Sequence, residues 1–265
     1  MATANSTARP AIKWKSIAGI LILTAGIVFA GEAQKKIFTA RAGAEFQRAQ
    51  SRFHSDPNNP TNAWQFARAA FDFAEFATND PERAALTNQG IAACRQSLAR
   101  EPKSAPVHYY LAMNLGQLAR TEFLGALKLV KEMEREFKTA GDLDARFDHA
   151  GPERNLGLLY RDAPGWPTSI GSKRKARSCA EQAVKLVPDY PANHLNLVET
   201  CLKWDERDAA KRELQVLDTI WPVARTNLTG ERWEPFWDDW SARRKAAREK
   251  INQTTSPVKS PKGSP

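Results

Sequence analysis

Two segments of sixteen residues decide the fold: KRKARSCAEQAVKLVP at residues 173–188 and RDAAKRELQVLDTIWP at residues 207–222. They lie 34 residues apart, and each ends in a proline. At this offset three small or apolar positions of the first segment align with three of the second: Ala176, Ala180 and Ala183 with Ala210, Leu214 and Leu217. This spacing predicts two amphipathic helices, each closed by its proline, which lacks a backbone N–H. A period of 34 residues indicates stacked helix pairs.

A second signature precedes these segments, at Leu156-Gly157-Leu158-Leu159-Tyr160. Its glycine allows the backbones of two paired helices to approach closely. We therefore expect an all-α solenoid of about four irregular helix–turn–helix repeats over residues 60–222. A helix at 37–53 within an N-terminal segment 34–59 precedes the array, and a capping helix within residues 223–252 covers its last repeat. The Ser- and Pro-rich tail 253–265 is expected to be disordered.

The net charge of +9 belongs mainly to the chain ends. Residues 1–33 carry +2 and residues 241–265 carry +6, so the body 34–240 carries only +1. This body lacks the basic face that binds phosphates, and we predict no nucleic-acid partner. The three cysteines, Cys94, Cys179 and Cys201, match no zinc or redox motif and are expected in the core. A Cys179–Cys201 disulfide is the alternative if the protein is exported.

The N-terminus has the pattern of an export signal. Arg9, Lys13 and Lys15 precede an uncharged apolar run from Ile17 to Ala30. A run of this length fits a signal peptide, with cleavage after Ala30 or Ala33, and also fits an uncleaved membrane anchor. We therefore assign residues 1–33 to a signal peptide or anchor, with membrane association through residues 17–30. The expected location is extracytoplasmic, in the periplasm.

The repeat signatures make residues 60–222 resemble tetratricopeptide-repeat (TPR) proteins. A finer resemblance, to TatT-type periplasmic TPR proteins, rests on Gly151-Pro152, on the Leu-Gly-x-x-Tyr signature, on Lys175-Ala176 and on the long loop Ala163–Gly171 with its Pro164-Gly165-Trp166-Pro167. That family is associated with TRAP-type solute transporters, and the resemblance implies an exported accessory protein. The lipid-modified cysteine of its best-known members is absent here.

The sequence predicts a binding surface rather than a catalytic or metal site. His54, His108, His149 and His194 are scattered, and no nucleophile elbow or phosphate loop occurs. We predict no cofactor. The first helix of each repeat should line a concave groove for a protein or peptide partner. Its predicted residues are Tyr109, Met113, Gln117, Arg154, Leu158, Arg161, Leu195, Glu199 and Lys203.

Trp166 is the most distinctive single candidate, because it lies between glycine and proline in the long loop. It is expected to plug a cavity of the array, with ligand contact as the alternative. The aromatic and basic C-terminal segment is expected to cap the array, with an anionic membrane surface as its alternative site.

The function predicted from the sequence is that of a non-enzymatic exported scaffold for protein–protein interaction. The first alternative is a periplasmic transporter accessory that binds a small apolar ligand or a solute-binding partner. A closed apolar tunnel favours the ligand, and an open groove favours a peptide. The second alternative is an enzyme with an unrecognised site.

Overall fold

The computed structural model describes residues 32–122 and 125–253, and within these ranges it contains ten α-helices and no strand. This confirms the predicted all-α class. The predicted export segment 1–33 and the tail fall almost entirely outside the described residues. The helices are α1 (Glu32–Ser55), α2 (Pro60–Ala74), α3 (Asp80–Leu98), α4 (Ala105–Ala119), α5 (Ala126–Leu143), α6 (Phe147–Asp162), α7 (Lys173–Leu186), α8 (Pro191–Lys203), α9 (Arg207–Asn227) and α10 (Glu234–Asn252).

Local sequence signals explain several helix starts. Asn59, Asn79 and Ser172 cap α2, α3 and α7, and each side chain accepts a hydrogen bond from a backbone N–H of the first turn. Helices α2, α3, α4, α8 and α10 carry a proline at their first or second position, where the missing N–H costs nothing.

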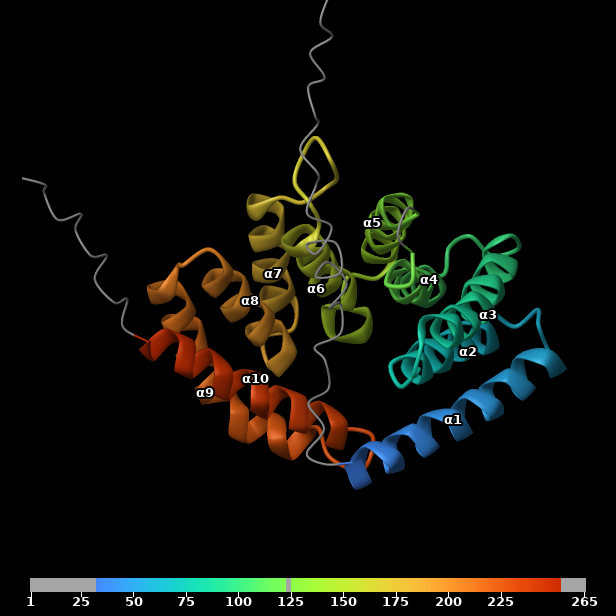
Figure 1. Cartoon of the computed structure of the whole chain (residues 1–265), viewed down its shortest axis with the longest axis horizontal. Coiled ribbons are helices and arrows are strands. Elements are labelled where there is room, and N and C mark those ends of the chain that lie inside the picture. Colours follow the sequence, from blue (N-terminus) through green and yellow to red (C-terminus); the bar gives the residue numbers. More distant parts are fainter. Residues whose placement is uncertain (1–31, 123–124, 254–265) are drawn as a thin grey trace, which may run out of the picture.

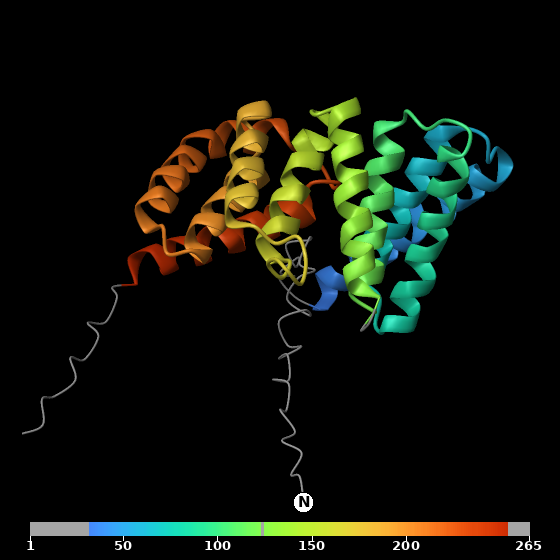
Figure 2. The same cartoon turned by 90° about the horizontal axis from the view of Figure 1, so that it is seen from above.

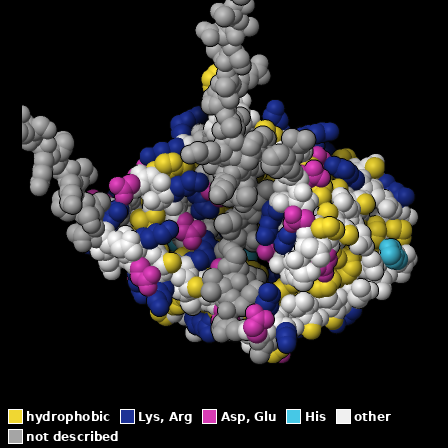
Figure 3. Space-filling model, viewed as in Figure 1, with side chains coloured by type: hydrophobic (Ala, Val, Ile, Leu, Met, Phe, Trp, Pro, Cys, Tyr) yellow, Lys and Arg dark blue, Asp and Glu magenta, His cyan; other side chains and the backbone are white. Residues whose placement is uncertain are grey.

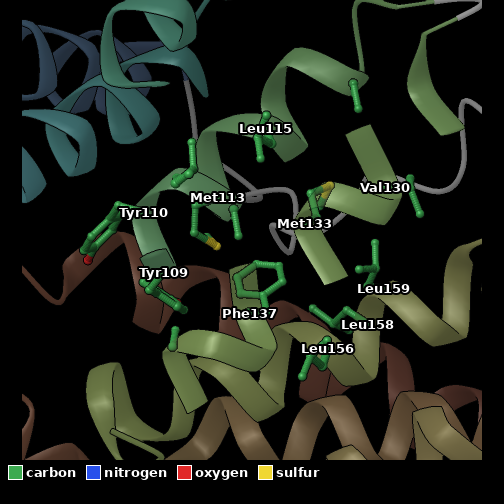
Figure 4. Packing of buried hydrophobic residues seen from close by; sticks show 14 of the residues in the cluster. Tyr109, Tyr110, Met113, Leu115, Val130, Met133, Phe137, Leu156, Leu158 and Leu159 are labelled. Carbon is green, nitrogen blue, oxygen red and sulfur yellow. The ribbon is translucent and has the colours of Figure 1, made fainter. Parts of the chain in front are cut away.

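Helices α2 to α9 pair in sequence order, α2 with α3, α4 with α5, α6 with α7 and α8 with α9. The pairs are visible edge-on in Figure 2. Small residues permit the close approach, as the signature predicts. A methyl group on Gly157 of α6 would lie 3.3 Å from the backbone nitrogen of Ala180 in α7. The central core lies between α4, α5 and α6, where Tyr109 points toward Phe137 and Tyr110 points away from it (Figure 4).

The array forms an arc whose two ends are bridged by α1 and α10 (Figure 1). Arg41 of α1 makes this bridge: its Nη2 lies 3.4 Å from Oε1 of Glu231, and its Nη1 lies 3.1 Å from Oε2 of Glu234 at the start of α10. Helix α10 also packs on α8 and α9. The C-terminal helix therefore caps the last repeat and, together with α1, narrows the concave side.

One detail differs from the sequence prediction. Pro188 follows the end of α7, but Pro222 lies inside α9, which continues to Asn227. Buried Ala224 and the contact of Trp221 with Trp237, 5.1 Å between ring centroids, compensate for the hydrogen bond that proline cannot make. Helix α6 begins with a turn of left-handed backbone.

Candidate functional site

The concave side of the array holds a partly open cavity of about 750 Å³, a size typical of small-molecule sites. Its lining comes from α1, α2, α4, α6, the start of α8 and α10, so it is surrounded by helices from both ends of the chain. Around it, positive and negative side chains alternate on the surface rather than forming a field of one sign (Figure 3).

The cavity has aromatic walls. Trp64 of α2 stacks on Tyr110 of α4 with 5.8 Å between ring centroids and 10° between planes. In a second aromatic group, His149 stacks on Tyr190 at 4.2 Å and 6°, and Trp233 meets the His149 ring edge-on at 5.8 Å. Phe38, Phe71, Phe76, Phe236 and Trp240 complete the aromatic lining. Offset and edge-on contacts of this kind fix the rings in place.

A strained turn contributes Asp148 to the cavity lining. Asp148, His149 and Ala150 have φ values of 49°, 57° and 61°, a left-handed conformation that costs about 1–2 kcal/mol for each non-glycine residue. Arg154 holds the turn by donating to the carbonyl oxygens of Asp148 and His149 at 2.9 and 2.8 Å. Asn193 donates to the His149 carbonyl at 3.2 Å. Strain that the surroundings hold so firmly is typical of functional sites.

The side chain of Asp148 anchors the same region. Its Oδ2 accepts hydrogen bonds from the Tyr109 hydroxyl at 2.7 Å and from Nη2 of Arg154 at 2.9 Å. Burial, followed by the charge of Asp148, raises the pKa of Tyr109 well above its usual value. Burial also lowers the pKa of His149. Near neutral pH, Tyr109 is therefore a hydrogen-bond donor.

Two further charged residues, Arg68 and Asp72 of α2, face the cavity. Nε of Arg68 lies 3.5 Å from Oδ2 of Asp72, a long ion pair. Half of the Asp72 side chain is open to the cavity (50%), yet protein surrounds it, and this desolvation raises the pKa of its carboxyl group. Arg232, before α10, also lines the cavity, and its guanidinium lies 5.1 Å from the centroid of the Trp233 ring.

The structure brings four of the nine predicted groove residues to the cavity: Tyr109, Met113, Arg154 and Leu158. Gln117 and Leu195 lie outside the lining and are buried; Gln117 bonds to Glu75, and Leu195 is fully covered in the core.

The remaining three predicted residues, Arg161, Glu199 and Lys203, form a chain of ion pairs outside the cavity lining. Arg161 bonds Glu199 and Asp162, Lys203 bonds Asp162, and Nε of Arg243 in α10 lies 2.7 Å from Oε1 of Glu199. Burial alone would raise the pKa of Glu199, but Arg243 and Arg161 lower it by more. This network attaches α10 to α6 and α8 and leaves no open groove at these residues.

The expectation that Trp166 plugs a cavity is wrong, because its side chain is 88% exposed. The loop that carries it is nevertheless well defined. The N–H of Gly171 donates to the Pro164 carbonyl at 2.8 Å, and that of Ser172 donates to the Tyr160 carbonyl at 2.9 Å. Of the C-terminal tryptophans, Trp237 and Trp240 are 5% and 1% exposed, so these two side chains pack in the array rather than face outward.

Sequence reasoning missed the contribution of α1, α2 and α10 to the cavity. One signal was present: Trp64, Arg68 and Asp72 recur every four residues and therefore share one helix face.

Metal-binding and membrane-spanning features are lacking in the part of the chain that the structure describes. Within residues 32–122 and 125–253, no cluster of His, Cys, Asp and Glu is placed to hold a metal ion. No described helix is long and apolar enough to cross a membrane. Cys94, Cys179 and Cys201 are free thiols.

Comparison with known proteins supports the repeat architecture. The crystal structure of TTC0263, a thermophilic TPR protein of Thermus thermophilus, matches with a TM-score of 0.58 and 18% identity, covering 79% of this chain and 92% of that one. This chain has a TPR-type fold. MamA matches with a TM-score of 0.48 and 15% identity over 73% of this chain and 96% of that one. A family model described as "Regulator of microtubule dynamics protein 1-3" matches residues 32–144, the segment of α1 to α5. Among curated proteins, none matches the sequence significantly.

Proposed function

We propose that this TPR-fold chain is a non-enzymatic binding protein whose central cavity holds a small, largely apolar ligand. The observation that carries the proposal is the contact of α1 with the start of α10 through Arg41, which narrows the concave side to a cavity. An open TPR groove suits an extended peptide, whereas a cavity of about 750 Å³ with aromatic walls suits a bounded molecule.

The polar groups of the cavity are suited to binding rather than to proton transfer. Tyr109 and Arg154 already donate hydrogen bonds to the Asp148 carboxylate. Burial raises the pKa of Tyr109 and Tyr110 well above the usual value, so neither hydroxyl is poised to act as a base near neutral pH.

Titration with the uncharged fluorescent probe N-phenyl-1-naphthylamine tests this function. Ala42 of α1 lines the cavity, so Ala42→Trp should fill part of it and weaken binding at least about tenfold. Ala44, on the same helix, is outside the lining, so Ala44→Trp is the matched control and should bind like the parent protein. The proposal fails if the parent does not bind the probe or if Ala42→Trp binds it equally well.

A second function, protein–protein scaffolding, is favoured by Trp166. An exposed tryptophan on a well-defined loop has the chemistry of an interface hot spot. Crosslinking and pull-down with the parent protein and Trp166→Ala tests it. Val223→Ala, at another exposed apolar residue (59%), is the control. Tubulin belongs among the partners tested, because the matched family model is named for microtubule dynamics. A partner captured equally by all three proteins would contradict a docking role for Trp166.

We also propose an extracytoplasmic location, with residues 1–33 as signal peptide or anchor, and a role as a TatT-like transporter accessory. The apolar run 17–30 and the Pro164–Pro167 loop support these proposals. N-terminal mass spectrometry of native protein from fractionated cells tests the location. Recovery of the uncleaved protein from the cytosol would refute it.

A further inference from the structure

Two tyrosine hydroxyls in the cavity have no hydrogen-bond partner among the described residues. The chain has four tyrosines. Tyr109 donates to Asp148 and Tyr160 donates to Glu134, at 2.7 and 2.6 Å. Tyr110 and Tyr190 line the cavity, are 5% and 6% exposed, and make no such bond within the described part of the chain. Neither hydroxyl is among the fully buried unpaired atoms, so both oxygens are open to the cavity and available to a ligand.

Stacking holds both tyrosine rings in fixed positions. The Tyr110 ring lies against Trp64, and the Tyr190 ring lies against His149. Burial raises the pKa of Tyr110 well above its usual value and that of Tyr190 to about 12, so both hydroxyls carry their protons at neutral pH. They therefore offer donors, and they do so without having to reorganise.

Positive charge exceeds negative charge around these hydroxyls. Arg154 is paired with Asp148 at 2.9 Å, and Arg68 is paired loosely with Asp72 at 3.5 Å. Arg232 forms no ion pair with a described residue. Both Arg68 and Arg232 are close enough to act electrostatically on Tyr110 and Tyr190. Three arginines against two aspartates leave one positive charge uncompensated.

We propose that the cavity selects a small organic monoanion, whose oxyanion group is bound by Arg68, Arg232 and the hydroxyls of Tyr110 and Tyr190. The aromatic or otherwise flat body of the ligand lies against Trp64 and Trp233. This inference rests on the proposed ligand-binding function of the same cavity. One negative charge would neutralise the excess, and charge-assisted hydrogen bonds would orient the ligand.

A matched pair of probes tests whether the cavity selects a monoanion. 1-Anilinonaphthalene-8-sulfonate is N-phenyl-1-naphthylamine with one sulfonate added, so the two differ by one anionic group. We expect the sulfonate to bind at least about tenfold more tightly than the uncharged probe. Salt should weaken binding of the sulfonate but leave binding of the uncharged probe unchanged.

Amino-acid substitutions test which residues bind the anionic group of the ligand. Arg232→Met should remove most of the preference for the sulfonate and leave binding of the uncharged probe within about twofold. Arg225→Met is its matched control: Arg225 also lies over a tryptophan, 4.7 Å from the Trp237 centroid, but outside the cavity lining. Tyr110→Phe and Tyr190→Phe keep the ring stacking and should each weaken sulfonate binding about threefold or more.

The outcomes separate the two proposals. If both probes bind equally and Ala42→Trp blocks both, the cavity function stands and the selection of a monoanion is refuted. A preference for the sulfonate that survives Arg232→Met and both tyrosine variants also refutes the assigned anion site. If the uncharged probe does not bind, or if Ala42→Trp has no effect on its binding, the cavity function itself is refuted.

Discussion

Nδ1 of His108 lies 2.6 Å from Oε2 of Glu136, and Nε2 of the same ring lies 2.9 Å from the carbonyl oxygen of Pro102. Because a carbonyl and a carboxylate oxygen only accept, this arrangement favours the imidazolium, in which both ring nitrogens donate. His194 repeats this geometry in α8, at 2.5 Å from Glu213 and 2.7 Å from the Pro188 carbonyl. In two different repeats, a His–Glu contact thus joins the first helix to the second.

The His108–Glu136 pair predicts a pH-dependent stability. Burial lowers the pKa of His108, but Glu136 and the Pro102 carbonyl raise it by more, so the net shift is upward. The stabilisation is therefore complete below the unfolded-state pKa of about 6.5 and is lost as pH rises through the folded-state value. His108→Ala should lower the free energy of unfolding by about 2 kcal/mol near pH 6. In urea unfolding, its difference from the parent should shrink as pH rises; a constant difference would contradict the charged pair.

Asp239 of α10 predicts a second effect of pH on folding stability, caused by the burial of a carboxyl group rather than by an ion pair. It is 3% exposed, its Oδ1 has no hydrogen-bond partner within the described chain, and burial raises its pKa to about 6. Ionising it in the folded state is unfavourable, so the protein loses stability as pH rises from the unfolded-state value of about 3.9 to about 6. Asp239→Asn should remove this part of the pH dependence in thermal unfolding. Asp238→Asn, at the neighbouring and less buried position, is the control, and an unchanged profile for Asp239→Asn would refute the assignment.

Gly151 predicts a steric effect on the strained turn. A methyl group there would lie 2.7 Å from Cε2 of Tyr109, whose ring is buried and bonded to Asp148. Gly151→Ala should therefore cost about 2 kcal/mol of unfolding free energy. Gly141→Ala is the control: its nearest neighbour would be Cβ of Pro152 at 3.4 Å, and alanine is favoured in a helix by up to about 1 kcal/mol. Equal unfolding midpoints for the two variants would contradict the crowding around Tyr109.

The Arg41 bridge predicts an effect on ligand exchange rather than on stability. The paired side chains are 42%, 76% and 50% exposed, and ion pairs this exposed contribute less than about 1 kcal/mol. Arg41→Glu should loosen the contact between α1 and α10 and increase the dissociation rate of a bound probe, with little change in Tm. Adding Glu234→Arg should restore slow release. Stopped-flow dilution measures this rate, and an unchanged rate for Arg41→Glu would exclude the bridge as a closing contact.

The repeat architecture was predictable because it depends on local spacing. The 34-residue offset and the Leu-Gly-x-x-Tyr signature report helix pairs in contact, and Gly157 lies against Ala180 as expected. The prediction that Pro222 closes its helix was wrong, since tertiary contacts of Trp221 and Ala224 extend α9 beyond it.

The cavity was only partly predictable. Its closure depends on contacts between residues 41 and 231–234, far apart in sequence, and no local pattern reports such a contact. The left-handed turn at Asp148–Ala150 is likewise imposed by Arg154 and Asn193 from outside the turn. Groove residues projected from regular repeat geometry therefore included Leu195, which is fully buried, and omitted Arg68 and Tyr190.

The most direct test of the central claim is a crystal structure of the protein with bound N-phenyl-1-naphthylamine. We predict density for the naphthyl ring inside the cavity, between Trp64 of α2 and Trp233 at the start of α10. A probe bound only on the outer surface, with solvent alone between these two tryptophans, would contradict the account.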